Sequence, residues 1–354
     1  IQPMKQLILC IALCLLFISS KAQNKQPVFS KAGFYSIKNS GREIYNFNVG
    51  WRFIKANIKN AEKINFNDKS WEIVNLPHGL EFLPSQASGS INYQGPAWYR
   101  KHFNLPDSLK GKKLTLHFEA IMGKSKIYIN GQLIKENFGG FLPFQVEIEN
   151  HIKWGEENVI AILADNSDDP TYPPGKAQNI MDFAYFGGIY RDVYLLSTNK
   201  IFISNPNNVD KTAGGGVFVH YEKVSKYNAE IIIKTDIINK NRYSKNINLE
   251  TKLVDKKGRI ITTTITKNRV RSNSSRTITQ KIKIKNPHLW SPDKPYLYDL
   301  KLMIKDNHGK SIDGLKNELV SEKLNLKVKK VFISMVKHTM INLLEPIDIK
   351  TMVT

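Results

Sequence analysis

The sequence contains two pairs of neighbouring carboxylates that could act as acids or bases, Glu156-Glu157 and Asp168-Asp169. Catalysis by two carboxyl groups needs side chains that approach a substrate from separate positions. Both pairs lie in apparent turns, and residues adjacent in a turn do not face each other across a substrate. We therefore interpret them as solvated loop charges and not as a catalytic pair.

Thiol chemistry would depend on Cys10 and Cys14, which lie in an apolar segment near the start of the chain. A methionine and a lysine precede the apolar run 7–18, which is the pattern of a secretory signal peptide. The sequence predicts a signal peptide over 1–22 with cleavage near Ala22, and hence a secreted or periplasmic protein. A lipid anchor on Cys14 is the alternative. No cysteine follows, which excludes disulfides, cysteine nucleophiles and thiolate metal sites from the mature chain.

The formal net charge of +21 could attract nucleic acid or an anionic surface. The lysines are spread along the chain, however, and no helix-turn-helix, zinc or RNA-binding-sheet motif accompanies them. We interpret the charge as a lysine-rich solvated surface and expect no nucleic-acid partner. Adhesion to acidic glycans is the alternative. No segment after the first apolar run is long enough to span a membrane.

Short runs rich in Val, Ile, Tyr and Phe predict the elements that must position any site. In the first half they cover 97–104, 113–121, 125–134, 143–149 and 158–164, with turn-forming residues between them. Asn130-Gly131 is the strongest hairpin signal, because both residues tolerate positive φ. No segment shows sustained helical periodicity, so we expect strands throughout.

The pattern changes at Ile201 to longer strands with turns at near-regular spacing. We predict strands over 228–238, 246–254, 259–266 and 276–285. This rhythm is typical of an immunoglobulin-like sandwich. The sequence therefore predicts an all-β protein of two sandwiches with a boundary near Asn199.

Six groups of residues follow one another along 45–305. They are Asn48-Val49-Gly50-Trp51-Arg52-Phe53 with Asp68, Trp71 and Leu76-Pro77-His78; Ala97-Trp98-Tyr99-Arg100-Lys101; Ile129-Asn130-Gly131 with Gly139-Gly140-Phe141 and Pro143-Phe144; Ala164-Asp165-Asn166-Ser167; Phe186-Gly187-Gly188-Ile189-Tyr190-Arg191-Asp192-Val193; and Pro287-His288-Leu289-Trp290-Ser291-Pro292 with Pro295-Tyr296-Leu297-Tyr298. Together they resemble the non-catalytic front of glycoside hydrolase family 2, the β-galactosidase and β-glucuronidase group.

The resemblance implies a jelly-roll-like sugar-binding sandwich over 23–199 and an immunoglobulin-like sandwich over 200–317. It also implies a secreted glycosidase of β-galactosidase type, whose two catalytic glutamates lie on a third domain, a (β/α)₈ barrel. Too few residues follow 317 to form that barrel, so we expect it to be absent and the chain to be inactive. We expect no cofactor and weak carbohydrate binding. A stand-alone carbohydrate-binding or glycan-adhesion module is the alternative.

The resemblance assigns two substrate-binding residues and no catalytic or metal-binding residue. Asp182 stands six positions before Gly188, where the family has an acidic residue that reaches the sugar subsite. Gln94 stands where the family lends a polar side chain to the substrate. A carboxylate is an apt acceptor for sugar hydroxyls. For Asp182 the alternative is a loop-capping aspartate.

Most other motif residues are expected to be scaffold. The motif tryptophans are expected in cores, since large aromatic side chains dominate sandwich packing. Gly187-Gly188 is expected to allow a tight turn, because no helix follows that could bind an anion. Arg191 and Asp192 are neighbours on a strand, so they should face opposite ways and have separate partners.

We interpret residues 318–354 as an out-of-frame tail. When each codon's third base is read with the first two bases of the next, Glu318 through Lys323 can encode IGFRK. Lys330 through Lys337 can then encode GFYINGK, and Leu344 through Thr351 can encode GANRHQD. Such phrases open the barrel in members of the family. The alternative is a divergent segment read in its true frame.

Overall fold

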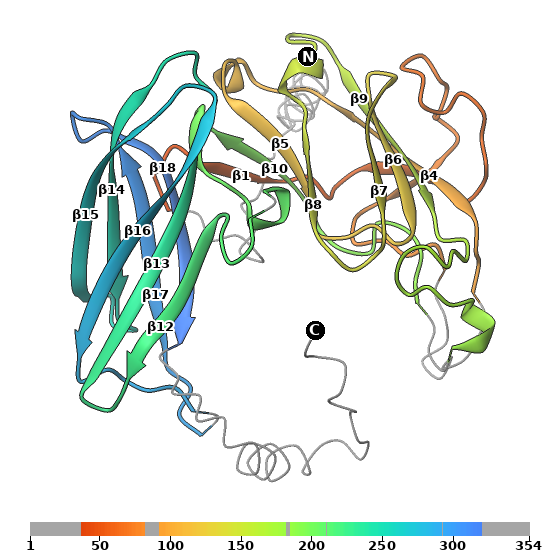
Figure 1. The fold of residues 1–354 in the computed structure, drawn as a ribbon. Helices are drawn as coiled ribbons and strands as arrows, with labels where there is room; N and C mark the ends of the chain where they lie inside the picture. The colour runs from red at the N-terminus through yellow and green to blue at the C-terminus, as the bar shows by residue number, and fades with distance from the viewer. Residues whose placement is uncertain (1–36, 82–91, 182–184, 210, 292, 321–354) are drawn as a thin grey trace, which may run out of the picture.

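The computed structural model describes residues 37–81, 92–181, 185–209, 211–291 and 293–320. The predicted signal peptide, Asp182 and the tail beyond Val320 lie outside these ranges. The described residues form two β-sandwiches joined side by side (Figure 1), which confirms the predicted all-β class. They form no closed barrel. Within these ranges no helix has the length and apolar character to cross a membrane.

The first sandwich packs a four-stranded sheet against a six-stranded sheet, both antiparallel. The four-stranded sheet has the order β1 (Glu43–Asn46), β10 (Val193–Thr198), β5 (Lys113–Phe118) and β8 (Phe144–Glu147). The six-stranded sheet has the order β3 (Glu72–Val74), β2 (Trp51–Ile54), β4 (Pro96–Phe103), β9 (Asn158–Asp165), β6 (Lys124–Ile129) and β7 (Gln132–Phe138). Residues from both sheets form one apolar core, as in a jelly-roll-like sandwich.

The hairpin predicted at Asn130-Gly131 joins β6 to β7. Both turn residues have positive φ, 51° and 84°, and Ile129 pairs with Gln132 across the turn. The Asn130 side chain also donates to the backbone carbonyl of His151 at 2.8 Å and accepts from Val159 N at 2.9 Å. The turn is therefore fixed both by its backbone conformation and by the strand beside it.

The second sandwich also has two antiparallel sheets. In one, β13 (Asn228–Asn239) pairs with β11 (Ile201–Ile203), β12 (Val217–Val224) and β16 (Ser274–Lys285). The other has the order β15 (Ile260–Val270), β14 (Lys245–Val254), β17 (Leu297–Lys305) and β18 (Ser311–Val320). Alternate residues of β16 are buried, which gives an apolar face turned to the core and a polar face turned to solvent. This matches the predicted immunoglobulin-like sandwich.

Strand β18 continues past 317, where the sequence analysis placed the end of the second domain. Leu315 and Leu319 both pack against the core, and Val320 pairs with Leu297 at the start of β17. The described chain leaves the second sandwich at this end.

An ion pair between buried side chains joins the two sandwiches. Arg42, just before β1, donates from Nε to Asp313 Oδ1 at 2.8 Å and from Nη2 to Asp313 Oδ2 at 2.7 Å. Asp313 on β18 also accepts from Ile203 N at 2.7 Å, and Arg42 Nη2 donates to Ile203 O at 2.9 Å. Gly41 has φ +89°, and a Cβ there would lie 2.3 Å from Ile312 O. Only glycine lets the two domains approach this closely.

Candidate functional site

Gln94 lies in the segment that leads into β4 and is hydrogen-bonded to two polar side chains. Its Nε2 donates to Asp168 Oδ1 at 2.7 Å and to Tyr185 Oη at 3.2 Å. The Tyr185 hydroxyl donates to the same carboxylate oxygen at 3.1 Å. Tyr185 is buried, Gln94 is half-buried and Asp168 is exposed, so these three residues, the Gln94 cluster, form a polar group that reaches from the interior to the surface.

Two buried amide side chains hold the segments that carry the Gln94 cluster. Asn92 N donates to Gln178 Oε1 at 2.7 Å, and Gln178 Nε2 donates to Asn92 Oδ1 at 2.6 Å. Asn92 Nδ2 also donates to the backbone carbonyl of Tyr185 at 2.7 Å. Because both amides are buried and paired, the loops before β4, after β9 and before β10 are kept in fixed register.

Asn166 holds the turn on which Gln94 lies. Its Oδ1 accepts from Gly95 N at 2.9 Å and its Nδ2 donates to Tyr93 O at 2.8 Å. Asn166 also packs closely against Gly187, where a Cβ would lie only 2.5 Å from Asn166 Nδ2. Gly188 has φ +95°, which confirms the tight turn predicted for this pair.

Burial, and after it the hydrogen bond to Asp168, raise the pKa of Tyr185 to about 12. The phenol therefore keeps its proton at neutral pH and donates to Asp168. The Gln94 cluster offers one carboxylate, one amide and one phenol, which suits hydrogen bonding to hydroxyl groups. It does not offer the two opposed carboxyl groups that retaining glycoside hydrolysis requires.

Gln94 lies in the cluster. Asp182 falls outside the described residues. Tyr185, three positions further along the chain, lies in the cluster. Asp168 was interpreted as a solvated loop charge, and it is exposed but bonded to Gln94 and Tyr185. Tyr185 was not predicted, since a lone tyrosine before a glycine pair carries no distinguishing pattern. Asp169 instead pairs with Lys124 at 2.5 Å.

The motif residues that were expected to be scaffold are buried, half-buried or in contact with neighbouring residues of the first or second sandwich. Trp51, Trp71 and Trp98 are buried, and Trp290 is half-buried. Asp192 accepts from Asn48 and from the Tyr194 hydroxyl, at 2.6 and 3.0 Å. The Arg191 guanidinium lies 5.8 Å from the ring centre of Tyr190. Arg191 and Asp192 therefore have separate partners, as predicted.

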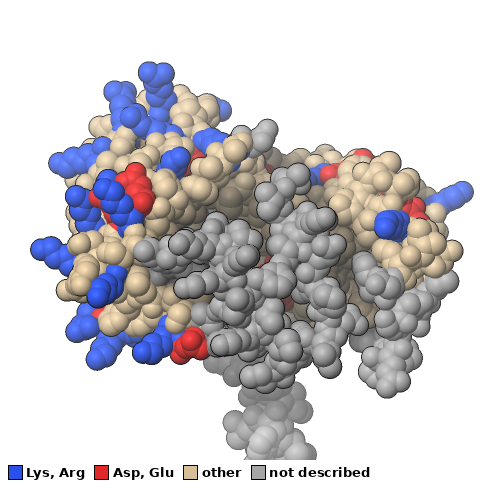
Figure 2. Space-filling model, turned by 60° about the horizontal axis from the view of Figure 1, so that its bottom comes forward, with Lys and Arg blue, Asp and Glu red and all other residues tan. Residues whose placement is uncertain are grey.

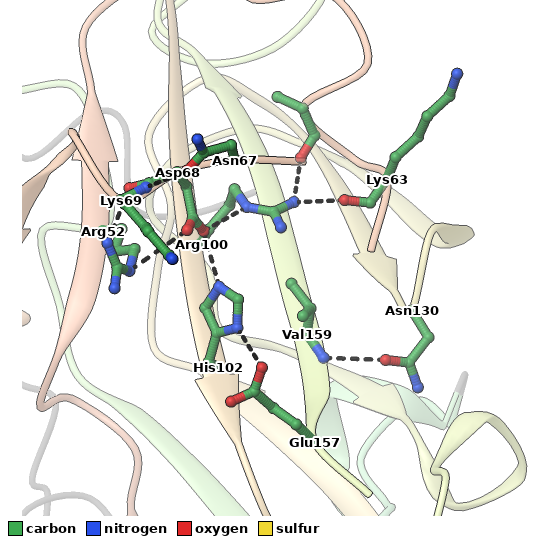
Figure 3. Close-up of polar contacts among 11 residues, drawn as sticks. Arg52, Lys63, Asn67, Asp68, Lys69, Arg100, His102, Asn130, Glu157 and Val159 are labelled. Atoms are coloured by element: carbon green, nitrogen blue, oxygen red, sulfur yellow. Dashed lines mark hydrogen bonds and ion pairs between the residues drawn. The ribbon is translucent and has the colours of Figure 1, made fainter. Parts of the chain in front are cut away.

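Asp68 is the centre of a charged network on the face of the six-stranded sheet that points away from the core between the sheets (Figure 3). Its carboxylate accepts from Arg100 Nε at 2.7 Å and from His102 Nε2 at 2.9 Å. Arg100 is fully buried and also donates to the backbone carbonyls of Ala61 and Lys63. The network therefore joins the loop after β2 to β4, and its role is structural.

A cavity of about 490 Å³ lies where the two sandwiches meet. Its lining carries both signs of charge, including Glu119, Arg191 and Lys316, beside the polar side chains of His117 and Gln145. No member of the Gln94 cluster lines it, so the cavity and the cluster are separate features. Across all described residues, no group of His, Cys, Asp and Glu side chains could hold a metal ion.

The buried His117 in this lining should make the stability of the protein depend on pH. Burial lowers the pKa of His117 to about 4, and Gln145 Nε2 lies 3.2 Å from Nδ1. Since the unfolded chain has the higher pKa, about 6.5, it binds the proton first as pH falls. His117 therefore favours the folded state fully above about pH 6.5, and about 3 kcal/mol is lost as pH falls to about 4.

The His117→Gln variant is expected to remove this loss. Urea unfolding between pH 4 and 7 measures it as the difference between variant and parent. His308→Gln, in an exposed turn, is the control and should follow the parent. Parallel pH profiles for His117→Gln and the parent would contradict the assignment.

Two protein-family models match the chain, one on each sandwich. The model described as glycosyl hydrolases family 2, sugar binding domain, matches residues 64–199. The model described as glycosyl hydrolases family 2 matches residues 215–319. Together they match more than half of the chain.

Curated relatives and solved structures agree with these models. A "Beta-glucuronidase" of Formosa agariphila is 35% identical over 80% of this chain and 30% of its own length. A "Beta-galactosidase" of Thermoanaerobacter pseudethanolicus is 34% identical over 75% of this chain and 33% of its own. The chain therefore spans about a third of the length of these relatives.

Among solved structures, a beta-glucuronidase from glycoside hydrolase family 2 superposes with a TM-score of 0.71. The two are 33% identical in sequence, and the match covers 81% of this chain and 31% of the solved one. A beta-glycosidase from Bacteroides vulgatus superposes with a TM-score of 0.63 at 27% identity, over 78% of this chain and 34% of that one.

Proposed function

The chain belongs to glycosyl hydrolases family 2, and from this membership we propose that its two sandwiches are the non-catalytic front of a secreted or periplasmic glycoside hydrolase of β-galactosidase type. The observation that supports this most is the order of the two matches, a sugar-binding sandwich followed directly by an immunoglobulin-like one. The predicted signal peptide over 1–22 supports export. Relatives named for β-galactosidase and for β-glucuronidase both match, so both sugars enter the test.

In this proposal the sandwiches contribute hydrogen-bonding groups at the edge of a sugar subsite and do not break the bond. The Gln94 cluster has a single carboxylate, whereas hydrolysis with retention uses two, about 5–5.5 Å apart. Gln94 and Asp182 are the residues we assign to substrate contact. Three of the four motif tryptophans are buried, so they offer no exposed platform, and we do not favour a stand-alone carbohydrate-binding module.

The purified 354-residue chain is expected to release no nitrophenol from nitrophenyl β-galactoside or β-glucuronide above the buffer rate. A gene whose frame is corrected near codon 318 and extended through the following codons is expected to encode a protein that hydrolyses one of the two. Hydrolysis by the 354-residue chain would refute the proposed inactivity. A corrected frame that encodes no (β/α)₈ barrel with two glutamates would refute the interpretation of the tail.

Binding is tested separately, by tryptophan fluorescence during titration with galactoside and glucuronide. The 354-residue chain is expected to respond weakly if at all. A strong response below millimolar sugar that is unchanged in Gln94→Ala would argue against the assigned contact.

A further inference from the structure

Three arginines line one open pocket at an end of the second sandwich. The pocket is formed by Arg269 at the end of β15, Arg276 near the start of β16, and Arg271 in the turn between them. Ser244 and Ser272 complete the lining. No acidic residue takes part in it.

The two loops that carry these residues are held together by one buried side chain. Asn239 is fully buried at the end of β13. Its Nδ2 lies 3.0 Å from the carbonyl of Tyr243, and 3.1 Å from the carbonyls of both Val270 and Arg271. In addition, Asn273 N donates to Asn241 O at 3.2 Å. The pocket is therefore preorganised, which lowers the entropy lost when a ligand binds.

The pocket arginines differ from the lysines elsewhere on this sandwich. Lys281 is paired with both Glu222 and Glu230, at 2.9 and 3.0 Å, and Lys305 is paired with Glu250 at 3.0 Å. None of the three pocket arginines makes an ion pair with any residue that the structure describes. Their charge is therefore available to a ligand.

The net positive charge of the described residues is concentrated on this sandwich, although lysines occur along the whole sequence. Residues 201–320 hold 23 Lys and Arg against 11 Asp and Glu, whereas residues 37–200 hold 19 against 17. Figure 2 shows Lys and Arg side chains gathered over the second sandwich, at the left. Such a field attracts polyanions and raises their rate of encounter.

A guanidinium group pairs with sulfate or carboxylate oxygens through two parallel hydrogen bonds. Three guanidinium groups around one pocket suit either one sulfate or several anionic groups on successive units of a polymer. Tyr243, next to Ser244, is 57% exposed and gives a ring against which a sugar could pack. A single ring is a poor platform for single-stranded nucleic acid, which stacks on several aromatic side chains.

We infer that this arginine pocket binds an anionic polysaccharide through its sulfate or carboxylate groups. The choice of a glycan rests on the proposed function; the choice of an anion rests on the pocket itself. The start of β14 lies beside the pocket and pairs with the end of β17, which in turn pairs with the start of β18. Val320 ends β18, so the pocket and Val320 lie at opposite ends of the sandwich.

The test compares two triple variants of the 354-residue chain in binding to dextran sulfate, polygalacturonate and uncharged dextran. Arg269→Gln with Arg271→Gln and Arg276→Gln removes the pocket charges. Lys226→Gln with Lys257→Gln and Lys294→Gln removes the same charge from exposed positions in turns at the opposite end. Thermal unfolding of each variant, which should match the parent, shows that the fold is retained.

The parent is expected to bind at least one of the two anionic polymers, and uncharged dextran not at all. The pocket variant is expected to lose about tenfold or more in affinity at low salt, and the control variant less than about threefold. Preference for dextran sulfate over polygalacturonate identifies sulfate as the ligand group, and the reverse identifies carboxylate. Replacing the same arginines by lysine should retain only part of the affinity, because the paired hydrogen bonds are lost.

Three results would overturn the inference: no binding of either polymer by the parent, equal losses in the two triple variants, or equal pocket-dependent binding of duplex DNA. The measurement involves no hydrolysis. A failure of the proposed function in the nitrophenyl assay and a failure here are therefore distinct results.

Discussion

Replacing Asp313 by alanine is expected to lower the free energy of unfolding by about 3–5 kcal/mol, because it leaves a buried guanidinium without its counter-charge. Asp313 is fully buried, and Arg42 is nearly so. An arginine side chain cannot shed its proton to escape the cost. The Ile203 amide would lose its acceptor as well. Urea unfolding followed by fluorescence, compared with the parent, measures the loss.

The matched control is Asp299→Ala, which breaks the partly exposed pair between Asp299 on β17 and Lys316 on β18 at 3.0 Å. It should cost less than about 1 kcal/mol, as pairs near the surface do. The double variant Arg42→Met with Asp313→Leu should recover part of the loss, since it leaves no unpaired charge. Equal effects of Asp313→Ala and Asp299→Ala would show that the buried pair does not hold the junction.

Replacing Asp68 by alanine should have a similar effect, about 3–5 kcal/mol, in the first sandwich. Arg100 would keep its buried charge and its contacts to the carbonyls of Ala61 and Lys63, but lose the only carboxylate to which its Nε is bonded. Glu157→Ala removes the other carboxylate bonded to His102, and the Glu157 side chain is 60% exposed. That control should cost less than about 1 kcal/mol. A loss in the control as large as in Asp68→Ala would refute this account.

The Asp68→Asn variant adds a pH signature to the same site. Burial alone would raise the pKa of Asp68, but hydrogen bonds from Arg100 and His102 outweigh it, so the pKa lies below its usual value. A lowered pKa in the folded state stabilises the protein above the unfolded value of about 3.9, and this stability is lost as pH falls through the folded value. The gap in unfolding free energy between parent and Asp68→Asn should therefore be full at pH 7 and shrink below about pH 4.

Several of the longer strands could be predicted from the sequence, because their signal is local, whereas β12, β17 and β18 were not predicted. Alternation of buried and exposed residues along β16 and the Asn130-Gly131 turn are each visible within a few residues. The short strands β1 and β3 have no such pattern, and β2 has it over only four residues. They form because distant strands offer them partners, as β10 does for β1.

The candidate site was predictable only in part, and for the same reason. Gln94 stood out by its place before the Gly95-Pro96 turn within a family motif. Its partners Asp168 and Tyr185 come from segments far along the chain. No spacing rule in the sequence brings them to Gln94. The arginine pocket was missed, although its three arginines lie close together around the connection from β15 to β16. Asn239 holds this connection against the one from β13 to β14, which the sequence pattern does not reveal.

The short connection between the sandwiches governs how force and proteases act on the molecule. Only Asn199 and Lys200 separate β10 from β11. The Asn199 side chain donates to the Ile312 carbonyl, and the Lys200 carbonyl accepts from Lys240 N at 2.8 Å. A protease cleaves most readily where the backbone is exposed and unbonded, so these two bonds should slow cleavage at this connection. Torque applied to either sandwich should therefore be passed to the other through these bonds.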